Sequence, residues 1–143
     1  MSVKFDVING ILTKCKADVK HITVPDTVKR ISSFGKYFLD IDSVHIPSSV
    51  EIIDDFAFAL CTSLKEIKIP EGTTTIGYKA FEGCTSLENI YIPQSVTEIY
   101  FSLFGYKYSK NLCVHTPASS QAESTIQQNY PDLTIINDYP EKG

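Results

Sequence analysis

The sequence predicts a solenoid, a stack of short repeats in which each repeat adds one strand to a parallel sheet and returns through short helical or irregular turns. Three observations lead to this fold class. Similar segments recur every 22 or 23 residues, each opens with alternating apolar and polar residues, and each alternation ends at a proline. Because one such unit is too short to bury its apolar side alone, stacked neighbours must supply the core.

The repeats align by their prolines, which are Pro25, Pro47, Pro70 and Pro93. The three residues before each proline read ITV, VHI, IKI and IYI. Alternation with β-branched residues in the apolar positions favours a strand with one buried side. Proline ends the strand because it has no N–H to donate to the ladder. A fifth copy places His115 at the proline position, with Leu112 and Val114 as its apolar pair.

Side chains alternate between the two faces of a strand, so the alignment sorts residues into columns. The expected buried ladder is Ile22, Val44, Ile67, Ile90 and Leu112. The expected outward column is Thr23, His45, Lys68, Tyr91 and Cys113. Beside it we expect His21, Ser43, Glu66, Asn89 and Asn111. In a curved stack these columns line the concave side, the surface that such repeats offer to partners.

The segments between strands have their own pattern. A second apolar pair follows each proline, at Val28/Ile31, Val50/Ile53, Thr73/Ile76 and Val96/Ile99. Next come AFALC at 57–61 and AFEGC at 80–84, which are too short for a stable isolated helix. We expect each to form one turn of helix that packs its phenylalanine and its cysteine inward.

Residues 64–84, LKEIKIPEGTTTIGYKAFEGC, resemble the BspA-type leucine-rich repeat, with its pattern L-x-x-I-x-I-P followed by I-G-x-x-A-F-x-x-C. The similarity covers roughly residues 5–136 and departs from the pattern at 31–41 and 100–111. It implies an α/β-type leucine-rich-repeat solenoid of about five stacked short parallel strands.

We expect a single domain, residues 1–143, covered at both ends. Its parts are an N-terminal hairpin cap at 1–20, repeats at 21–115, a C-terminal helix–strand cap at 116–138 and a frayed tail at 139–143. Ser120 and Glu123 have the spacing of a capping box that starts the helix, and Pro131 ends it. The caps prevent exposure of an apolar end rung.

Charge and composition exclude several classes of function. The chain has 13 basic and 17 acidic residues, a formal net charge of −4, and residues 71–143 carry the whole deficit with 4 basic against 8 acidic residues. Nucleic acid and anionic membrane are therefore not expected as partners. No apolar run approaches the roughly 20 residues that span a bilayer, and the start MSVKFDVING has no apolar signal core. We expect a soluble unprocessed chain or a fragment without its export signal.

The cysteines offer a weak signal for chemistry. Cys61 and Cys84 lie one repeat apart, where the alternatives are a disulfide, half a metal site or two buried free thiols, and we expect the last. Cys113 is expected to point outward, and Cys15 falls in the N-terminal hairpin. The sequence also contains no glycine-rich phosphate loop, no G-x-S-x-G and no H-E-x-x-H. We therefore expect no enzyme activity, cofactor or metal.

The histidines and paired carboxylates are expected to be solvated. His21, His45 and His115 fall in different columns of the alignment, so they do not converge on an ion or a nucleophile. Asp54 and Asp55 lack the further oxygen ligands of a calcium loop. Both sets are interpreted as ordinary surface residues.

The outward columns are the candidate partner-binding site. Its expected residues are His45, Lys68, Tyr91, Glu66 and Asn89, a mixed set that suits a protein or a glycan better than a polyanion. The resemblance implies a secreted or cell-surface adhesion module whose partner is a host or matrix protein or a glycan. The alternative is a structural or targeting spacer domain of a larger secreted or surface protein.

Overall fold

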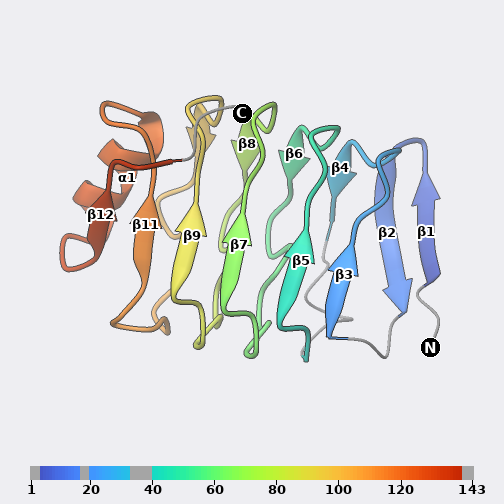
Figure 1. Ribbon diagram of the computed structural model, residues 1–143, viewed down its shortest axis with the longest axis horizontal. Coiled ribbons are helices and arrows are strands. Elements are labelled where there is room, and N and C mark those ends of the chain that lie inside the picture. The colour runs from blue at the N-terminus through green and yellow to red at the C-terminus, as the bar shows by residue number, and fades with distance from the viewer. Residues whose placement is uncertain (1–3, 17–19, 33–39, 140–143) are drawn as a thin grey trace.

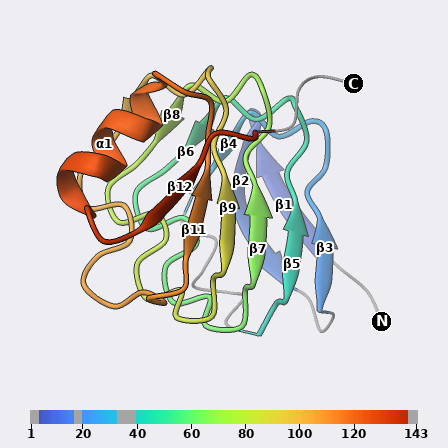
Figure 2. The same cartoon turned by 60° about the vertical axis from the view of Figure 1, so that its left-hand side comes forward.

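A computed structural model of the protein describes residues 4–16, 20–32 and 40–139. The chain coils through successive rungs, and its strands form two six-stranded sheets (Figure 1). We call them the front sheet, which faces the viewer in Figure 1, and the back sheet. Figure 2 shows them as two layers, with the helix packed at the C-terminal end of the stack.

The front sheet has the order β12-β11-β9-β7-β5-β3, and all its neighbouring strands are parallel. Its strands are β3 (His21–Thr23), β5 (Ser43–His45), β7 (Glu66–Lys68), β9 (Asn89–Tyr91), β11 (Cys113–His115) and β12 (Thr134–Ile136). The predicted parallel solenoid is thus confirmed.

The back sheet, which the sequence did not predict, has the order β1-β2-β4-β6-β8-β10. Its strands are β1 (Lys4–Ile8), β2 (Ile11–Lys16), β4 (Arg30–Ile31), β6 (Ile52–Ile53), β8 (Thr75–Ile76) and β10 (Glu98–Ile99). The first two form an antiparallel hairpin, and the other pairs are parallel. The second apolar pair of each repeat therefore belongs to a strand of its own.

The buried ladder differs from its prediction at one rung. Ile22, Val44, Ile67 and Ile90 lie inside as expected. In β11, however, Val114 and not Leu112 pairs with Ile90, so the expected fifth member is wrong, although Leu112 is also buried. By the same register, Pro117 and not His115 is the counterpart of the repeat prolines. A strand alternates with a period of 2, so a shift of two residues keeps apolar side chains inside and the sequence pattern does not detect it.

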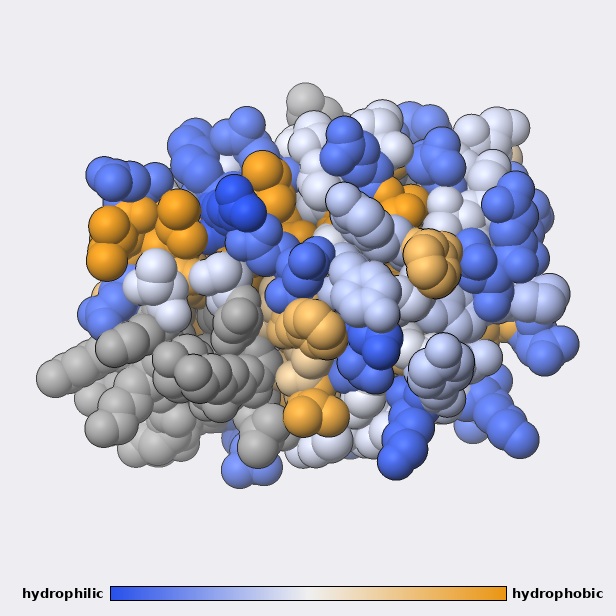
Figure 3. All heavy atoms as spheres, turned by 180° about the vertical axis from the view of Figure 1, so that it is seen from behind, coloured by the Kyte–Doolittle hydropathy of each residue, from blue (hydrophilic) through white to orange (hydrophobic). Residues whose placement is uncertain are grey.

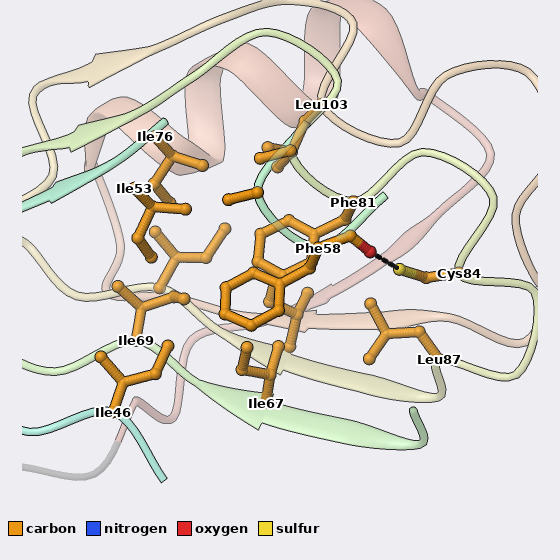
Figure 4. Packing of buried hydrophobic residues seen from close by; sticks show 14 of the residues in the cluster. Ile46, Ile53, Phe58, Ile67, Ile69, Ile76, Phe81, Cys84, Leu87 and Leu103 are labelled. Atoms are coloured by element: carbon orange, nitrogen blue, oxygen red, sulfur yellow. Dashed lines mark hydrogen bonds between the residues drawn. The ribbon is translucent and has the colours of Figure 1, made fainter. Parts of the chain in front are cut away.

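The third side of the rungs at 54–61 and 77–84 consists of turns rather than the expected turn of helix. Backbone N–H groups on this side donate to the next rung, from Phe58 to the carbonyl of Ala80 at 2.8 Å and from Leu60 to that of Glu82 at 2.7 Å. The N–H groups between them bond within the turn, as from Ala59 to the carbonyl of Phe56 at 3.1 Å, so this side combines turns with stacking on the next rung. The inward packing is confirmed: Phe58 and Phe81 are fully buried and stack with ring centroids 5.4 Å apart (Figure 4).

Gly77 marks the closest approach between two rungs. A Cβ on this residue would lie 2.4 Å from the backbone nitrogen of Asp55 in the preceding rung. The Asp55 carboxylate accepts the backbone N–H of Tyr78 at 2.8 Å. Asp54 accepts a bidentate pair of hydrogen bonds from Arg30, both at 2.7 Å. These two carboxylates lie at the surface, as expected, and in addition they link neighbouring rungs.

The C-terminal cap has the predicted form. Helix α1 (Gln121–Asn129) begins at Ser120, whose hydroxyl accepts the N–H of Glu123 at 3.0 Å. The Glu123 carboxylate reaches back to the N–H of Ser119 at 3.0 Å, which completes the cap. Buried Ile126 and the following Tyr130 pack this end against the core, and β12 then extends the front sheet.

Gly77→Ala is expected to destabilise the protein by about 1–3 kcal/mol, because the added methyl group meets rigid backbone rather than a movable side chain. Urea unfolding measures the loss. Gln94→Ala, at an exposed position in a neighbouring turn, should change stability by no more than about 0.5 kcal/mol. Equal effects of the two substitutions would contradict the close approach at Gly77.

Candidate functional site

The outer face of the front sheet carries two columns of side chains, as the alternation predicts. The first column is Thr23, His45, Lys68, Tyr91, His115 and Ile136. The second is His21, Ser43, Glu66, Asn89, Cys113 and Thr134. The two-residue shift of β11 changes the expected members of that rung: His115 replaces Cys113, and Cys113 replaces Asn111.

The five candidate residues divide into two groups. His45, Glu66 and Lys68 are exposed on β5 and β7. Tyr91 and Asn89, both on β9, are partly buried. Burial, reinforced by the negative charge of Glu66, raises the pKa of the Tyr91 phenol, so this residue is a neutral hydrogen-bonding group at physiological pH.

His115 joins β11 to this face, and its interpretation as a solvated residue is wrong. Its side chain is buried, and its ring stacks on that of Tyr91 with centroids 4.2 Å apart. Its Nε2 lies 2.8 Å from Oδ1 of Asn89, and its Nδ1 lies 2.6 Å from Oδ1 of Asp138. His45, on β5, occupies the same column three rungs away from His115, so the expectation of separate columns also fails for this pair.

The segment after β12 crosses the carboxyl ends of the front strands (Figure 2). Asn137 donates to the carbonyl of Thr116 at 3.0 Å. Tyr139 donates its hydroxyl to the carbonyl of Ile69 at 2.6 Å, and its ring centroid lies 5.8 Å from the Lys68 ammonium. Tyr139 was expected in a frayed tail, but it is only 9% exposed. Residues 140–143 lie outside the described residues.

This crossing segment, residues 137–139, bounds the outer face on one side. It connects the last rung to β7, and it brings a carboxylate and a tyrosine beside Lys68 and Tyr91. No repeat pattern predicts this segment, because it lies after the last strand. The exposed part of the face is therefore centred on His45, Glu66 and Lys68.

Cys61 and Cys84 are buried free thiols, as predicted. Burial raises the pKa of both, that of Cys84 to about 12, which keeps them protonated and unreactive at neutral pH. The thiol of Cys84 donates to the carbonyl of Phe58 at 3.1 Å (Figure 4). Cys113 is partly exposed on the second column. Within residues 4–16, 20–32 and 40–139, no group of three or more His, Cys, Asp or Glu side chains is arranged to hold a metal ion.

A second surface, on the turns, was missed by the sequence analysis. It carries exposed aromatic and aliphatic side chains, which break the polar surface seen from behind (Figure 3). They are Phe56, Leu60, Tyr100, Phe101 and Tyr106. The available signal for its C-terminal part was the departure of residues 100–111 from the repeat pattern, where Leu103-Phe104 replaces Ala-Phe and additional tyrosines follow.

The stacked parallel strands, with a buried aliphatic ladder inside and columns of side chains outside, together define a leucine-rich-repeat solenoid. The family model for the BspA type leucine rich repeat region, in 6 copies, matches residues 8–113. The chain therefore belongs to the BspA-type leucine-rich repeat family. No curated protein matches it.

Three solved structures share the fold. A leucine rich repeat protein of T. pallidum is 26% identical with a TM-score of 0.60, over 67% of this chain and 45% of that protein. A leucine rich cell surface protein of Faecalibacterium prausnitzii is 23% identical with a TM-score of 0.55, over 83% of this chain and 44% of that one. A leucine-rich repeat protein of Bacteroides ovatus is 22% identical with a TM-score of 0.58, over 83% and 42%. This chain matches less than half the length of each.

Among the residues that the structure describes, no helix is long and apolar enough to cross a membrane.

Cys61→Ser is expected to cost about 1–3 kcal/mol of stability, because it moves a hydroxyl from water to a fully buried apolar position. Cys84→Ser is the matched control and should cost less, since the Phe58 carbonyl is available as an acceptor. Urea unfolding of both variants gives the comparison. A larger loss at position 84 than at position 61 would contradict this account.

Tyr139→Phe is expected to cost about 0.5–1.5 kcal/mol near pH 8 through the lost hydrogen bond to Ile69. Burial raises the pKa of Tyr139 from 10.0 to about 12, so the folded state favours the neutral phenol. Its stabilisation is complete below about pH 10 and is lost as the pH rises toward 12. The stability difference between wild type and variant should therefore shrink between about pH 8 and 11. A constant difference would disprove the buried position of the phenol.

Proposed function

We propose that this chain is a non-catalytic, adhesion-type module that binds a protein partner through the outer face of the front sheet. The observation that carries the proposal is the exposed group His45, Glu66 and Lys68, flanked by the ordered Tyr91 and Asn89. A face with a cation, a carboxylate, an imidazole and a phenol suits a protein surface of mixed charge.

Side chains that are held in fixed positions on one flank of this face support a binding role. The Tyr91 ring is stacked on His115, and Asn89 is hydrogen bonded to the same imidazole. Side chains that are already held in place lose little conformational freedom when a partner binds. A tyrosine of this kind combines a large contact area with a polar group, which is typical of residues that dominate binding energy.

Membership of the BspA-type family also supports the proposal, because leucine-rich-repeat domains generally bind proteins. A similar solved structure is described as a cell surface protein, which favours an extracellular or surface location for this chain as well. The same proposal includes the class of the partner, which is a host or matrix protein or a glycan that it carries.

A triple variant, His45→Ala, Lys68→Ala and Tyr91→Phe, should lose partner binding and remain folded. Phenylalanine keeps the ring that stacks on His115, and the other two side chains are exposed, so the melting temperature should fall only slightly. Affinity for a captured protein should fall by about 1–3 kcal/mol. Wild type and variant are compared by quantitative pull-down from candidate host and matrix extracts.

The control for this experiment is Phe56→Ala, an exposed position on the turns. Proteins retained by wild type and by Phe56→Ala but lost by the triple variant would be partners of the front face. Full retention by the triple variant would exclude this face and favour the spacer function.

A further inference from the structure

A pocket of about 270 Å³ opens on the turn side of the molecule, between the last turn segment and the end of α1. Four aromatic residues line it: Phe101, Tyr106, Tyr108 and Tyr130. It lies apart from the front-sheet face and takes no part in the function proposed above. Exposed aromatic groups gathered around a hollow are uncommon on soluble proteins and mark binding sites.

The inner wall of the pocket is held rigidly. The Tyr130 hydroxyl accepts the N–H of Phe104 at 3.1 Å and donates to the carbonyl of Gly105 at 3.3 Å. Its ring packs edge to face against Tyr108, with centroids 5.2 Å apart, and likewise against Phe104 at 5.2 Å. The wall is therefore preformed before any ligand arrives.

The outer wall is exposed but also anchored. Phe101 and Tyr106 are 62% and 91% exposed, although both are aromatic. The Lys79 ammonium lies 5.7 Å from the Tyr106 ring centroid and 3.6 Å from the Glu82 carboxylate. The cation holds the ring, and the carboxylate balances its charge.

The lining selects for a neutral ligand with hydroxyl groups. The residues that line the pocket are uncharged, and the neighbouring Lys79 and Glu82 are paired with each other, so an ionic ligand would lose water without gaining a free counter-charge. Polar groups are nevertheless present. Asn129 uses its amide nitrogen on the Thr125 carbonyl at 2.8 Å, which leaves its amide oxygen as an acceptor. The Ser102 hydroxyl is buried with no hydrogen-bond partner among the described residues.

We propose that this pocket binds one ring of a neutral saccharide. A sugar ring has an apolar C–H face that packs on an aromatic ring, and hydroxyl groups at its edge that pair with amide and hydroxyl groups. The volume suits a single ring, since pockets for larger ligands begin at about 300 Å³. A purely apolar ligand would leave the Asn129 amide oxygen unpaired, and a charged ligand would meet Lys79 and Glu82 already paired with each other.

The test is a titration of the ¹⁵N-labelled chain, residues 1–143, with three neutral hexasaccharides: cellohexaose, mannohexaose and N-acetylchitohexaose. At least one should give saturable shifts confined to residues 101–108 and 129–130. Phe101→Ala and Tyr106→Ala, both at exposed positions, should each weaken that binding about tenfold or more. Phe56→Ala is the matched control, because it removes an exposed phenylalanine outside the pocket and should leave affinity within about twofold.

Three results would overturn the proposal: no saturable shift with any of the three hexasaccharides at about 10 mM, equal affinity of the pocket variants and wild type, or shifts at the pocket with a decaproline peptide alone. The last result would identify a proline-rich segment as the occupant. The front-face triple variant should bind the saccharide as wild type does, so failure here and failure of the proposed function are distinguishable.

Discussion

Rung-to-rung backbone hydrogen bonding around a buried aliphatic ladder is the constraint on which the structure depends. Each front strand is only three residues long, so no single pairing is stable alone. The back strands and the turns also form backbone hydrogen bonds between neighbouring rungs, for example from the N–H of Phe58 to the carbonyl of Ala80. Because every side of a rung is tied to its neighbours, the outward side chains are fixed in columns.

The distance between neighbouring rungs limits the size of the residues that lie between them. Where two rungs approach most closely, at Gly77, only a hydrogen fits against the Asp55 backbone. At the turns, where the two rungs are also hydrogen bonded, Phe58 and Phe81 stack inside the core. Buried Thr73 replaces an apolar residue at no cost in hydrogen bonding, because its hydroxyl donates to the Val50 carbonyl at 2.7 Å.

The C-terminal end of the stack shapes both candidate surfaces. The segment after β12 returns over the front sheet, where Asp138 and Tyr139 bind His115 and the Ile69 carbonyl. Tyr130, at the end of α1, forms the rigid wall of the pocket on the turns. A cap that closes the core thus also supplies a wall to each of two separate faces.

The sequence by itself determined the solenoid, the front ladder from Ile22 to Ile90, the inward Phe58, Phe81 and cysteines, and the capped final helix, since each depends on local periodicity. Tertiary structure decided what periodicity cannot detect. The register of β11 depends on the length of the preceding turn, because a two-residue shift preserves the alternation. The back sheet, the tail contacts of Tyr139 and the aromatic pocket depend on residues distant in sequence, which meet only when the rungs stack.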